Sequence, residues 1–170
     1  MIKPKDFAVT NVLLLFMTLA CVVSRDWTVV DPVLQWENCN NCYAVAARDV
    51  LLWHMPHLKN ITLQELMEDS HQTCNGGVPT KIWNHYFHKK NKVTSITKMG
   101  LITTRLKKII NQYGPVVLNK GTNHLVTAFD VSKQGILIRD PKEKHLKIWK
   151  TGEILKESTK GLFYIAYPLL

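Results

Sequence analysis

Two cysteines three residues apart, Cys39 and Cys42, are the side chains of this sequence best suited to covalent chemistry. The second cysteine opens an alanine-rich apolar run that stops before Pro56, which predicts a helix over Cys42–Met55 that is buried on nearly all sides. The thiolate is the nucleophilic form of cysteine, and the N-terminus of a helix stabilises negative charge. The sequence therefore places the Cys42 thiol where its ionised form is favoured.

The first 24 residues have the layout of a secretory signal. Lys3 and Lys5 precede an apolar run over residues 7–23, which is short and interrupted by polar residues for a transmembrane helix. Ser24 is small enough to precede a cleavage site, and an uncleaved membrane anchor is the alternative. We expect residues 1–24 to be a signal peptide and residues 25–170 to form one domain.

This signal predicts a secreted protein, either extracellular or in a vacuole-like or lysosome-like compartment. Entry into the secretory pathway permits disulfide bonds. It also makes Asn60, in the sequence Asn60-Ile61-Thr62, an acceptor for N-glycosylation.

The pairing of the cysteines stays open at this level. Once Cys21 leaves with the signal, Cys39, Cys42 and Cys74 remain, and an odd count in a secreted chain leaves one thiol unpaired. A Cys39–Cys42 bridge would make a redox motif, and a zinc site would need ligands from elsewhere. A Cys39–Cys74 bridge would leave Cys42 free.

The net charge of +9 and the pI near 9.4 come from scattered lysines and arginines. Such a distribution is typical of a solvated surface rather than of a nucleic-acid footprint. Six histidines show no metal-ligand spacing, and we expect neither a metal nor a cofactor; these are His54, His57, His71, His85, His88 and His145.

The pattern of apolar residues predicts helices in the first part of the chain and strands after it. Helices are expected from the Thr62–Glu65 capping box to Asp69, over Pro79–Lys90, and from Thr103 or Thr104 to Tyr113. Short β-rich runs follow Pro115 at Val116–Leu118, His124–Val131, Gly135–Arg139, His145–Trp149 and Leu162–Tyr167. We expect an α+β fold in two lobes, a helical one over about 25–113 and a β lobe over about 114–170.

Several short segments, taken together and in order, resemble papain-like cysteine peptidases of the papain and cathepsin type. That family reads Cys-Gly-Ser-Cys-Trp-Ala at its nucleophile and Asn-His-Ala-Val at its histidine, and it also contains Cys-Asn-Gly-Gly. The matching segments span nearly all of residues 25–170, as in the small plant proteins that lack a prosegment: Arg25-Asp26-Trp27, Asn38-Cys39-Asn40-Asn41-Cys42-Tyr43-Ala44, Cys74-Asn75-Gly76-Gly77, Asn123-His124-Leu125-Val126, Gly135-Ile136-Leu137-Ile138-Arg139-Asp140 and Gly161-Leu162-Phe163-Tyr164.

This resemblance implies catalytic roles for three residues. Cys42 would attack a peptide carbonyl and form a thioester, and His124 would take the thiol proton and later give it to the leaving amine. Asp140 would hold the imidazole in the correct tautomer, at a position where the family normally has Asn. The backbone N–H of Cys42 would be one oxyanion donor.

The second oxyanion donor of the family is a Gln three residues before the first cysteine of the motif. That position is Trp36 here, and Gln35 lies one residue earlier. A one-residue bulge would bring Gln35 into the site; without it, the oxyanion hole is incomplete.

The resemblance also implies a Cys39–Cys74 disulfide and a substrate-binding strip at Gly76 and Gly77, where a missing side chain lets another backbone approach. It implies a peptide or protein substrate and a monomer, with neither nucleic acid nor membrane as a partner after signal cleavage.

Each of these features also has a plain structural interpretation. His124 lies between apolar residues, as core histidines do, and Asp140 before Pro141 is typical of a turn. Gly76-Gly77 is also typical of a turn. The Asp-Pro ending additionally resembles the leader-peptide peptidases of bacterial exporters, although those lack Cys-Asn-Gly-Gly.

Three hypotheses follow for the function. The first is a papain-like cysteine endopeptidase, and the second is a papain-like pseudoenzyme that binds a peptide or protein, which the displaced Gln35 favours. The third is a secreted thiol–disulfide protein that uses Cys39 and Cys42.

Overall fold

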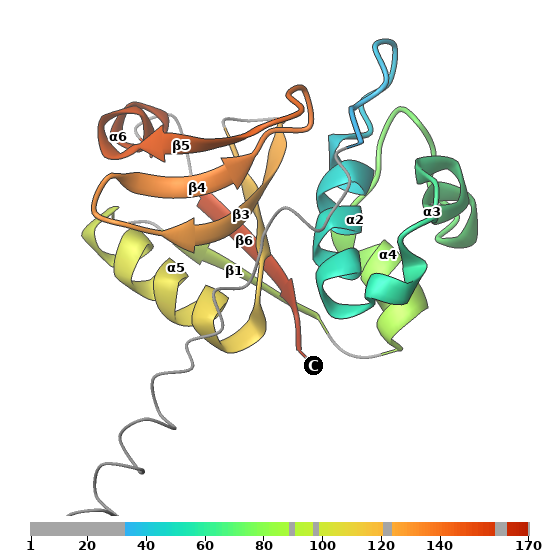
Figure 1. Cartoon of the computed structure of the whole chain (residues 1–170), viewed down its shortest axis with the longest axis horizontal. Coiled ribbons are helices and arrows are strands. Elements are labelled where there is room, and N and C mark those ends of the chain that lie inside the picture. The colour runs from blue at the N-terminus through green and yellow to red at the C-terminus, as the bar shows by residue number, and fades with distance from the viewer. Residues whose placement is uncertain (1–32, 89–90, 97–98, 121–123, 159–162, 170) are drawn as a thin grey trace, which may run out of the picture.

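The structure, a computed structural model, describes residues 33–88, 91–96, 99–120, 124–158 and 163–169. In these ranges three α-helices and a short 3-10 helix precede a sheet that carries two more helices (Figure 1). The elements are α2 (Cys42–His54), η2 (Pro56–Leu58), α3 (Leu63–Asp69), α4 (Pro79–Phe87), β1 (Asn91–Ile96), α5 (Met99–Tyr113), β2 (Val116–Asn119), β3 (Leu125–Val131), β4 (Gly135–Arg139), β5 (Leu146–Lys150), α6 (Thr151–Ser158) and β6 (Phe163–Pro168).

The sheet has the strand order β1-β6-β2-β3-β4-β5, and every neighbouring pair is antiparallel. The strands from β2 to β5 follow one another as hairpins. After α6 the chain returns, and β6 lies between β1 and β2 (Figure 1). Thr127 of β3 is paired with Arg139 of β4. The start of β3 and the end of β4 therefore lie side by side, at the same end of these two strands.

The central strand β3 is covered on both faces. Val126 and Ala128 are fully buried in one apolar cluster with Leu106 and Ile110 of α5. Thr127 points the opposite way, and its hydroxyl donates to the carbonyl of Ala46 in α2 over 3.4 Å. Because side chains alternate along a strand, burial on both faces gives β3 its nearly continuous apolar sequence.

The helix α2 is confirmed as a buried central helix that begins at Cys42. Ala44, Ala46 and Ala47 are fully buried, and their small side chains let α2 lie close to the sheet on one side and to α4 on the other. Trp83 of α4 donates its indole N–H to the carbonyl of Ala47.

Two charged residues of α2 are also buried, and both have partners. Arg48 donates to the carbonyls of Ile61 and Lys59 and so holds the chain that follows the helix. Asp49 pairs with Arg139 of β4 at 2.7 Å, with side chains only 3% and 4% exposed. Burial raises the pKa of Asp49, and the Arg139 guanidinium opposes that rise. This pair connects α2 to the end of β4.

Most predicted elements are found with ends shifted by a few residues, including the Thr62–Glu65 capping box at the start of α3. Three elements were not predicted, the short 3-10 helix η2, the edge strand β1 and the helix α6. The helix α5 begins at Met99, before the expected cap at Thr103 or Thr104. It packs against the sheet and shares an apolar cluster with the strands, whereas the sequence-based prediction placed it in the helical lobe.

We predict that Asp49→Asn destabilises the protein by about 3–5 kcal/mol, because it leaves the Arg139 guanidinium buried without a counter-charge. Urea unfolding followed by circular dichroism measures this change. Glu37→Gln, which neutralises an exposed carboxylate, is the matched control and should change stability by less than about 0.5 kcal/mol. Equal stability of the two variants would contradict a structural role for the pair.

Candidate active site

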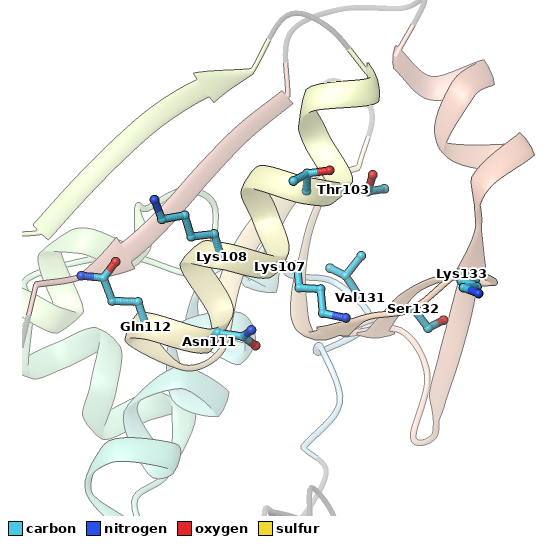
Figure 2. A pocket seen from close by; sticks show the side chains of 9 residues that line it. Thr103, Lys107, Lys108, Asn111, Gln112, Val131, Ser132 and Lys133 are labelled. Carbon is cyan, nitrogen blue, oxygen red and sulfur yellow. The ribbon is translucent and has the colours of Figure 1, made fainter. Parts of the chain in front are cut away.

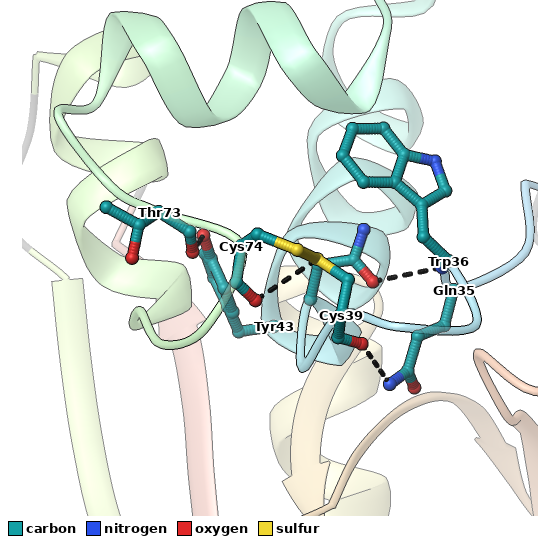
Figure 3. The surroundings of a disulfide bond; sticks show 7 residues. Gln35, Trp36, Cys39, Tyr43, Thr73 and Cys74 are labelled. Carbon is teal, nitrogen blue, oxygen red and sulfur yellow. Dashed lines mark hydrogen bonds between the residues drawn. A yellow bond between two sulfur atoms is a disulfide. The ribbon is translucent and has the colours of Figure 1, made fainter.

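Cys42 is the first residue of α2, and its side chain is 7% exposed. The predicted disulfide between Cys39 and Cys74 is present, with the two Cα atoms 5.2 Å apart (Figure 3). It leaves Cys42 as the free thiol among the described residues. This pairing excludes the Cys39–Cys42 redox motif, so the thiol–disulfide hypothesis has no support in the structure.

His124 and Asp140 meet because β3 and β4 are antiparallel. His124 directly precedes β3, Asp140 directly follows β4, and the imidazole Nε2 lies 2.6 Å from the Asp140 Oδ1. The Cys42 side chain is hydrogen-bonded to His124. Since Nε2 is engaged with Asp140, Nδ1 is the ring nitrogen that remains for the thiol. The structure thus brings together the three predicted catalytic side chains in one chain of contacts.

The surroundings of the thiol favour its ionised form. Burial raises the pKa of Cys42, but the hydrogen bond to His124, the positive charge of that imidazole and the backbone N–H groups of Leu125 and Tyr43 lower it more. The net result is a pKa below the ordinary range of a thiol.

The imidazole is correspondingly basic. Hydrogen bonds to Asp140 and then to Cys42 raise the pKa of His124 to about 9, against the opposing effect of burial. Burial also raises the pKa of Asp140, yet its hydrogen bonds to His124, the Lys142 N–H and Lys120 hold the pKa of this carboxyl far below its usual range. The two shifts therefore act in the same sense, because a lowered thiol pKa and a raised imidazole pKa both favour the thiolate–imidazolium pair.

The Asp140 carboxylate, 5% exposed, has partners on both oxygens. Oδ1 accepts from His124 Nε2 and, over 3.1 Å, from the Lys142 N–H. Oδ2 lies 3.1 Å from the Lys120 ammonium and 3.8 Å from that of Lys147. Asp140 also forms a turn, because its carbonyl accepts from the Glu143 N–H, so the turn interpretation is compatible with the predicted orienting role.

Gln35 lies against the cysteine motif, whereas Trp36 is 43% exposed. The Gln35 side-chain amide donates to the Cys39 carbonyl over 2.7 Å (Figure 3). The backbone N–H of Gln35 donates to the Pro141 carbonyl over 2.8 Å. A turn closed by the Cys39 N–H and the Trp36 carbonyl lies between Gln35 and the motif. Gln35 therefore lies beside the segment that carries Cys42, in spite of its displacement in the sequence.

The two glycines that follow Cys74 differ in their surroundings. A Cβ on Gly77 would lie 2.4 Å from ring carbons of Tyr43, so the close packing of this ring requires glycine there. The Tyr43 hydroxyl donates to the Thr73 carbonyl, which fixes the ring beneath the loop. A Cβ on Gly76 would meet no atom within 4 Å. Gly76 and Gly77 are both exposed, and their role in substrate binding stays a prediction.

Lys120 and the Asp49–Arg139 pair were not predicted from the sequence. Lys120 had a signal, because it follows the predicted strand 116–118 and precedes His124 by four residues, the spacing of a short hairpin connection. Its N–H donates to the His124 carbonyl over 2.6 Å. The Asp49–Arg139 pair joins residues 90 positions apart and has no local signal.

A hollow of about 680 Å³ lies away from the predicted catalytic residues, between α5 and the β3–β4 turn (Figure 2). Its lining is polar and basic and consists of Thr103, Thr104, Lys107, Lys108, Asn111, Gln112, Val131, Ser132 and Lys133. Within the described ranges, no three His, Cys, Asp or Glu side chains are grouped so that they could hold a metal ion. No described helix is long and apolar enough to cross a membrane.

Some predictions fall outside the described residues. They are the signal peptide, residues 1–24, and the family-like segments Arg25-Asp26-Trp27, Asn123 and Gly161-Leu162. Asn60 is described and is exposed after η2; whether it carries a glycan stays a prediction.

Neither a protein-family model nor a curated protein matches this sequence. Solved structures with a similar fold include a double-glycine-motif protease from an AMS/PCAT transporter, in complex with its leader peptide, at 17% identity and a TM-score of 0.54; the match covers 81% of this chain and 91% of that one. The peptidase domain of Streptococcus ComA, a bifunctional ABC transporter, matches at 14% identity and 0.54, with 81% and 97% covered. A Bacillus anthracis protein described as a C39-like peptidase matches at 12% and 0.53, with 82% and 94% covered.

These neighbours are C39-like cysteine peptidases, and they show that the chain has a papain-like fold of this kind, built from helices and an antiparallel sheet. The finer resemblance to papain, cathepsins and the small plant proteins is not supported, because the neighbours are of the type that the Asp-Pro ending suggested. The division into two lobes stays a prediction.

We predict that Cys42 reacts with iodoacetamide at about pH 6, where an ordinary cysteine is less than about 1% thiolate. His124→Ala should slow this reaction about tenfold or more, because it removes the hydrogen bond and the positive charge that stabilise the thiolate. Mass spectrometry of the alkylated peptide against time gives the rate at each pH. His57→Ala, which removes an exposed histidine, should react like the unmodified chain. If His124→Ala and His57→Ala react alike, the thiolate is not held by His124.

Proposed function

We propose that this protein is a cysteine peptidase that cleaves peptide bonds through a thioester on Cys42. The observation that carries the proposal is the chain of contacts from the Cys42 thiol to His124 and from His124 to Asp140. The nucleophile is the first residue of α2, the base directly precedes β3 and the orienting group directly follows β4, so three elements of the packed core hold their geometry.

The reaction would proceed in two halves. The Cys42 thiolate attacks the peptide carbonyl, and His124, which already holds the proton, donates it to the leaving amine as the C–N bond breaks. A thioester remains on Cys42. His124, now neutral, takes a proton from water as the hydroxide attacks the thioester. When the tetrahedral intermediate collapses, the Cys42 thiolate leaves and the carboxylic acid is released, and the proton kept on His124 restores the thiolate–imidazolium pair.

The oxyanion formed in each half needs donors that are fixed in advance. The Cys42 backbone N–H, free of intrahelical partners at the start of α2, is one. Gln35 is the second: its side-chain nitrogen carries two hydrogens, and one already donates to the Cys39 carbonyl, which fixes the amide beside the motif.

The second candidate function is a catalytically impaired protein that binds peptides. The observation that favours it is the same hydrogen bond from the Gln35 side chain to the Cys39 carbonyl. This bond directs the amide nitrogen toward the loop of Cys39 instead of toward a bound substrate. In that case the surface beside Cys42 and His124 would hold a peptide without cleaving it. Both candidates take a peptide or protein as ligand, and one neighbour in the fold comparison is a peptidase bound to a leader peptide.

We further propose that the chain is secreted, with residues 1–24 removed and Asn60 glycosylated. The Cys39–Cys74 disulfide supports an oxidising compartment, and the exposed position of Asn60 leaves it accessible to modification.

Peptidase activity is tested by incubating the folded, disulfide-bonded protein with a peptide library and identifying cleavage products by mass spectrometry. We expect cleavage that is lost in Cys42→Ala and in His124→Ala, together with labelling of Cys42 by an epoxide warhead. Labelling without cleavage of any peptide would favour the binding protein. If Cys42 is neither labelled nor needed for cleavage, the proposal is wrong.

Gln35→Ala should lower kcat for peptide cleavage by about 10²–10³-fold, the usual effect of removing one oxyanion donor, with a much smaller change in KM. Steady-state kinetics on one cleaved peptide measures both constants. Trp36→Phe is the control, because Trp36 occupies the position that the family motif assigns to the donor but its side chain is exposed. If Trp36→Phe lowers kcat more than Gln35→Ala does, Gln35 is not the donor.

A further inference from the structure

The Asp140 carboxylate is shared between two cations that approach it from different strands. His124 Nε2 lies 2.6 Å from Oδ1, and the Lys120 ammonium lies 3.1 Å from Oδ2. The Lys120 side chain is 28% exposed and that of Asp140 is 5% exposed, so this ion pair is largely shielded from water. It is not an ordinary surface pair, and it lies one contact away from the imidazole.

The backbone holds Lys120 in this place. Lys120 directly follows β2, and its N–H donates to the His124 carbonyl over 2.6 Å. The residue that carries the ammonium and the residue that carries the imidazole therefore face each other across the end of the β2–β3 hairpin. A shift of one would move the other relative to Asp140.

An aspartate in the orienting position creates a problem that this lysine can relieve. A carboxylate stabilises the imidazolium strongly, and the basic imidazole that results gives up its proton reluctantly. Yet the proposed reaction needs His124 to give that proton to the leaving amine. A second cation close to the same carboxylate partly offsets the negative electrostatic potential that the carboxylate creates at the imidazole.

We propose that Lys120 is a positioning residue that shares the Asp140 carboxylate with His124 and so limits how tightly the imidazole holds its proton. This inference rests on the proposed function, because it assigns Lys120 a part in the same site. Lys120 itself does not touch the reacting atoms; it acts through Asp140.

The other charged groups around Asp140 are weaker or are paired elsewhere. Lys147 of β5 lies 3.8 Å from Oδ2 and is also bound to Glu143. Lys142 contributes its backbone N–H. Arg139 is paired with Asp49 in the core, and Cys42 of α2 is hydrogen-bonded to the imidazole. Lys120 is therefore the cation to remove.

The test titrates His124 directly, without substrate. The full chain is labelled on histidine, its imidazole signals are followed by NMR from about pH 5 to 10.5, and the His124 signal is assigned by its absence in His124→Ala. In Lys120→Met, which keeps the length of the side chain without its charge, the pKa of His124 should rise by about half a unit or more, a threefold or greater change in proton affinity. Lys120→Arg should restore the value of the unmodified chain.

Lys133→Met is the matched control, because it removes an exposed lysine in the hollow beside α5, away from the catalytic residues. The same shift in Lys133→Met as in Lys120→Met would mean a general charge effect and would overturn the inference, as would an unchanged or lowered pKa of His124 in Lys120→Met. Failure of the proposed function is a separate result: Cys42 would not be labelled and no peptide would be cleaved, whatever the titration of His124 shows.

Where peptide cleavage is detected, its pH profile gives a second measurement. The alkaline limb of kcat/KM reports the loss of the imidazolium proton in the free enzyme, so in Lys120→Met this limb should move to higher pH by the same amount as the NMR titration. A limb that stays in place while the NMR value moves would show that Lys120 does not act on the catalytic proton, and this too would overturn the inference.

Discussion

The geometry of the candidate site depends on the buried ion pair between Asp49 and Arg139. Asp49 lies two turns along α2 from Cys42, and Arg139 directly precedes Asp140 at the end of β4. One interaction therefore fixes the helix that carries the thiol against the strand that carries the orienting carboxylate. Two apolar side chains of the same volume could also be buried there. They would not fix the register and the distance between α2 and β4 in the same way, since charges attract strongly only at close, well-oriented contact.

Charges of opposite sign alternate along the site, from the Cys42 thiolate through the His124 imidazolium and the Asp140 carboxylate to the Lys120 ammonium. In a partly buried environment such alternation offsets the loss of hydration that each charge suffers alone. It also means that no residue in this series titrates independently. A change of charge at Lys120 alters the titration of Cys42 through Asp140 and His124. An amide in place of Asp140 would interrupt the series, and the lysine would then lack a counter-charge.

Local signals were enough to predict the parts of the site that lie on regular elements. The stop at Pro56 and the alanine-rich run define α2 and place Cys42 at its start, and the antiparallel strand pattern brings His124 near Asp140. The edge strand β1 was missed because Asn91–Ile96 is short and mostly polar, and its pairing partner β6 lies more than 60 residues away in the sequence. The Asp49–Arg139 and Lys120–Asp140 pairs were missed because charged residues in a sequence are expected on the solvent-exposed surface, and only the topology shows that these are buried.

The glycines after Cys74 explain why the sequence resembled one branch of the papain-like peptidases while the fold matched another. Gly76 and Gly77 were assigned to a substrate strip, but packing inside the fold is a sufficient cause for Gly77, since any side chain there would overlap the Tyr43 ring. The disulfide beside it closes the same loop onto the start of α2. A motif that packing alone can require says little about ancestry or substrate. The Asp-Pro ending is different, because Asp140 faces the imidazole, and its charge enters the chemistry of the site directly.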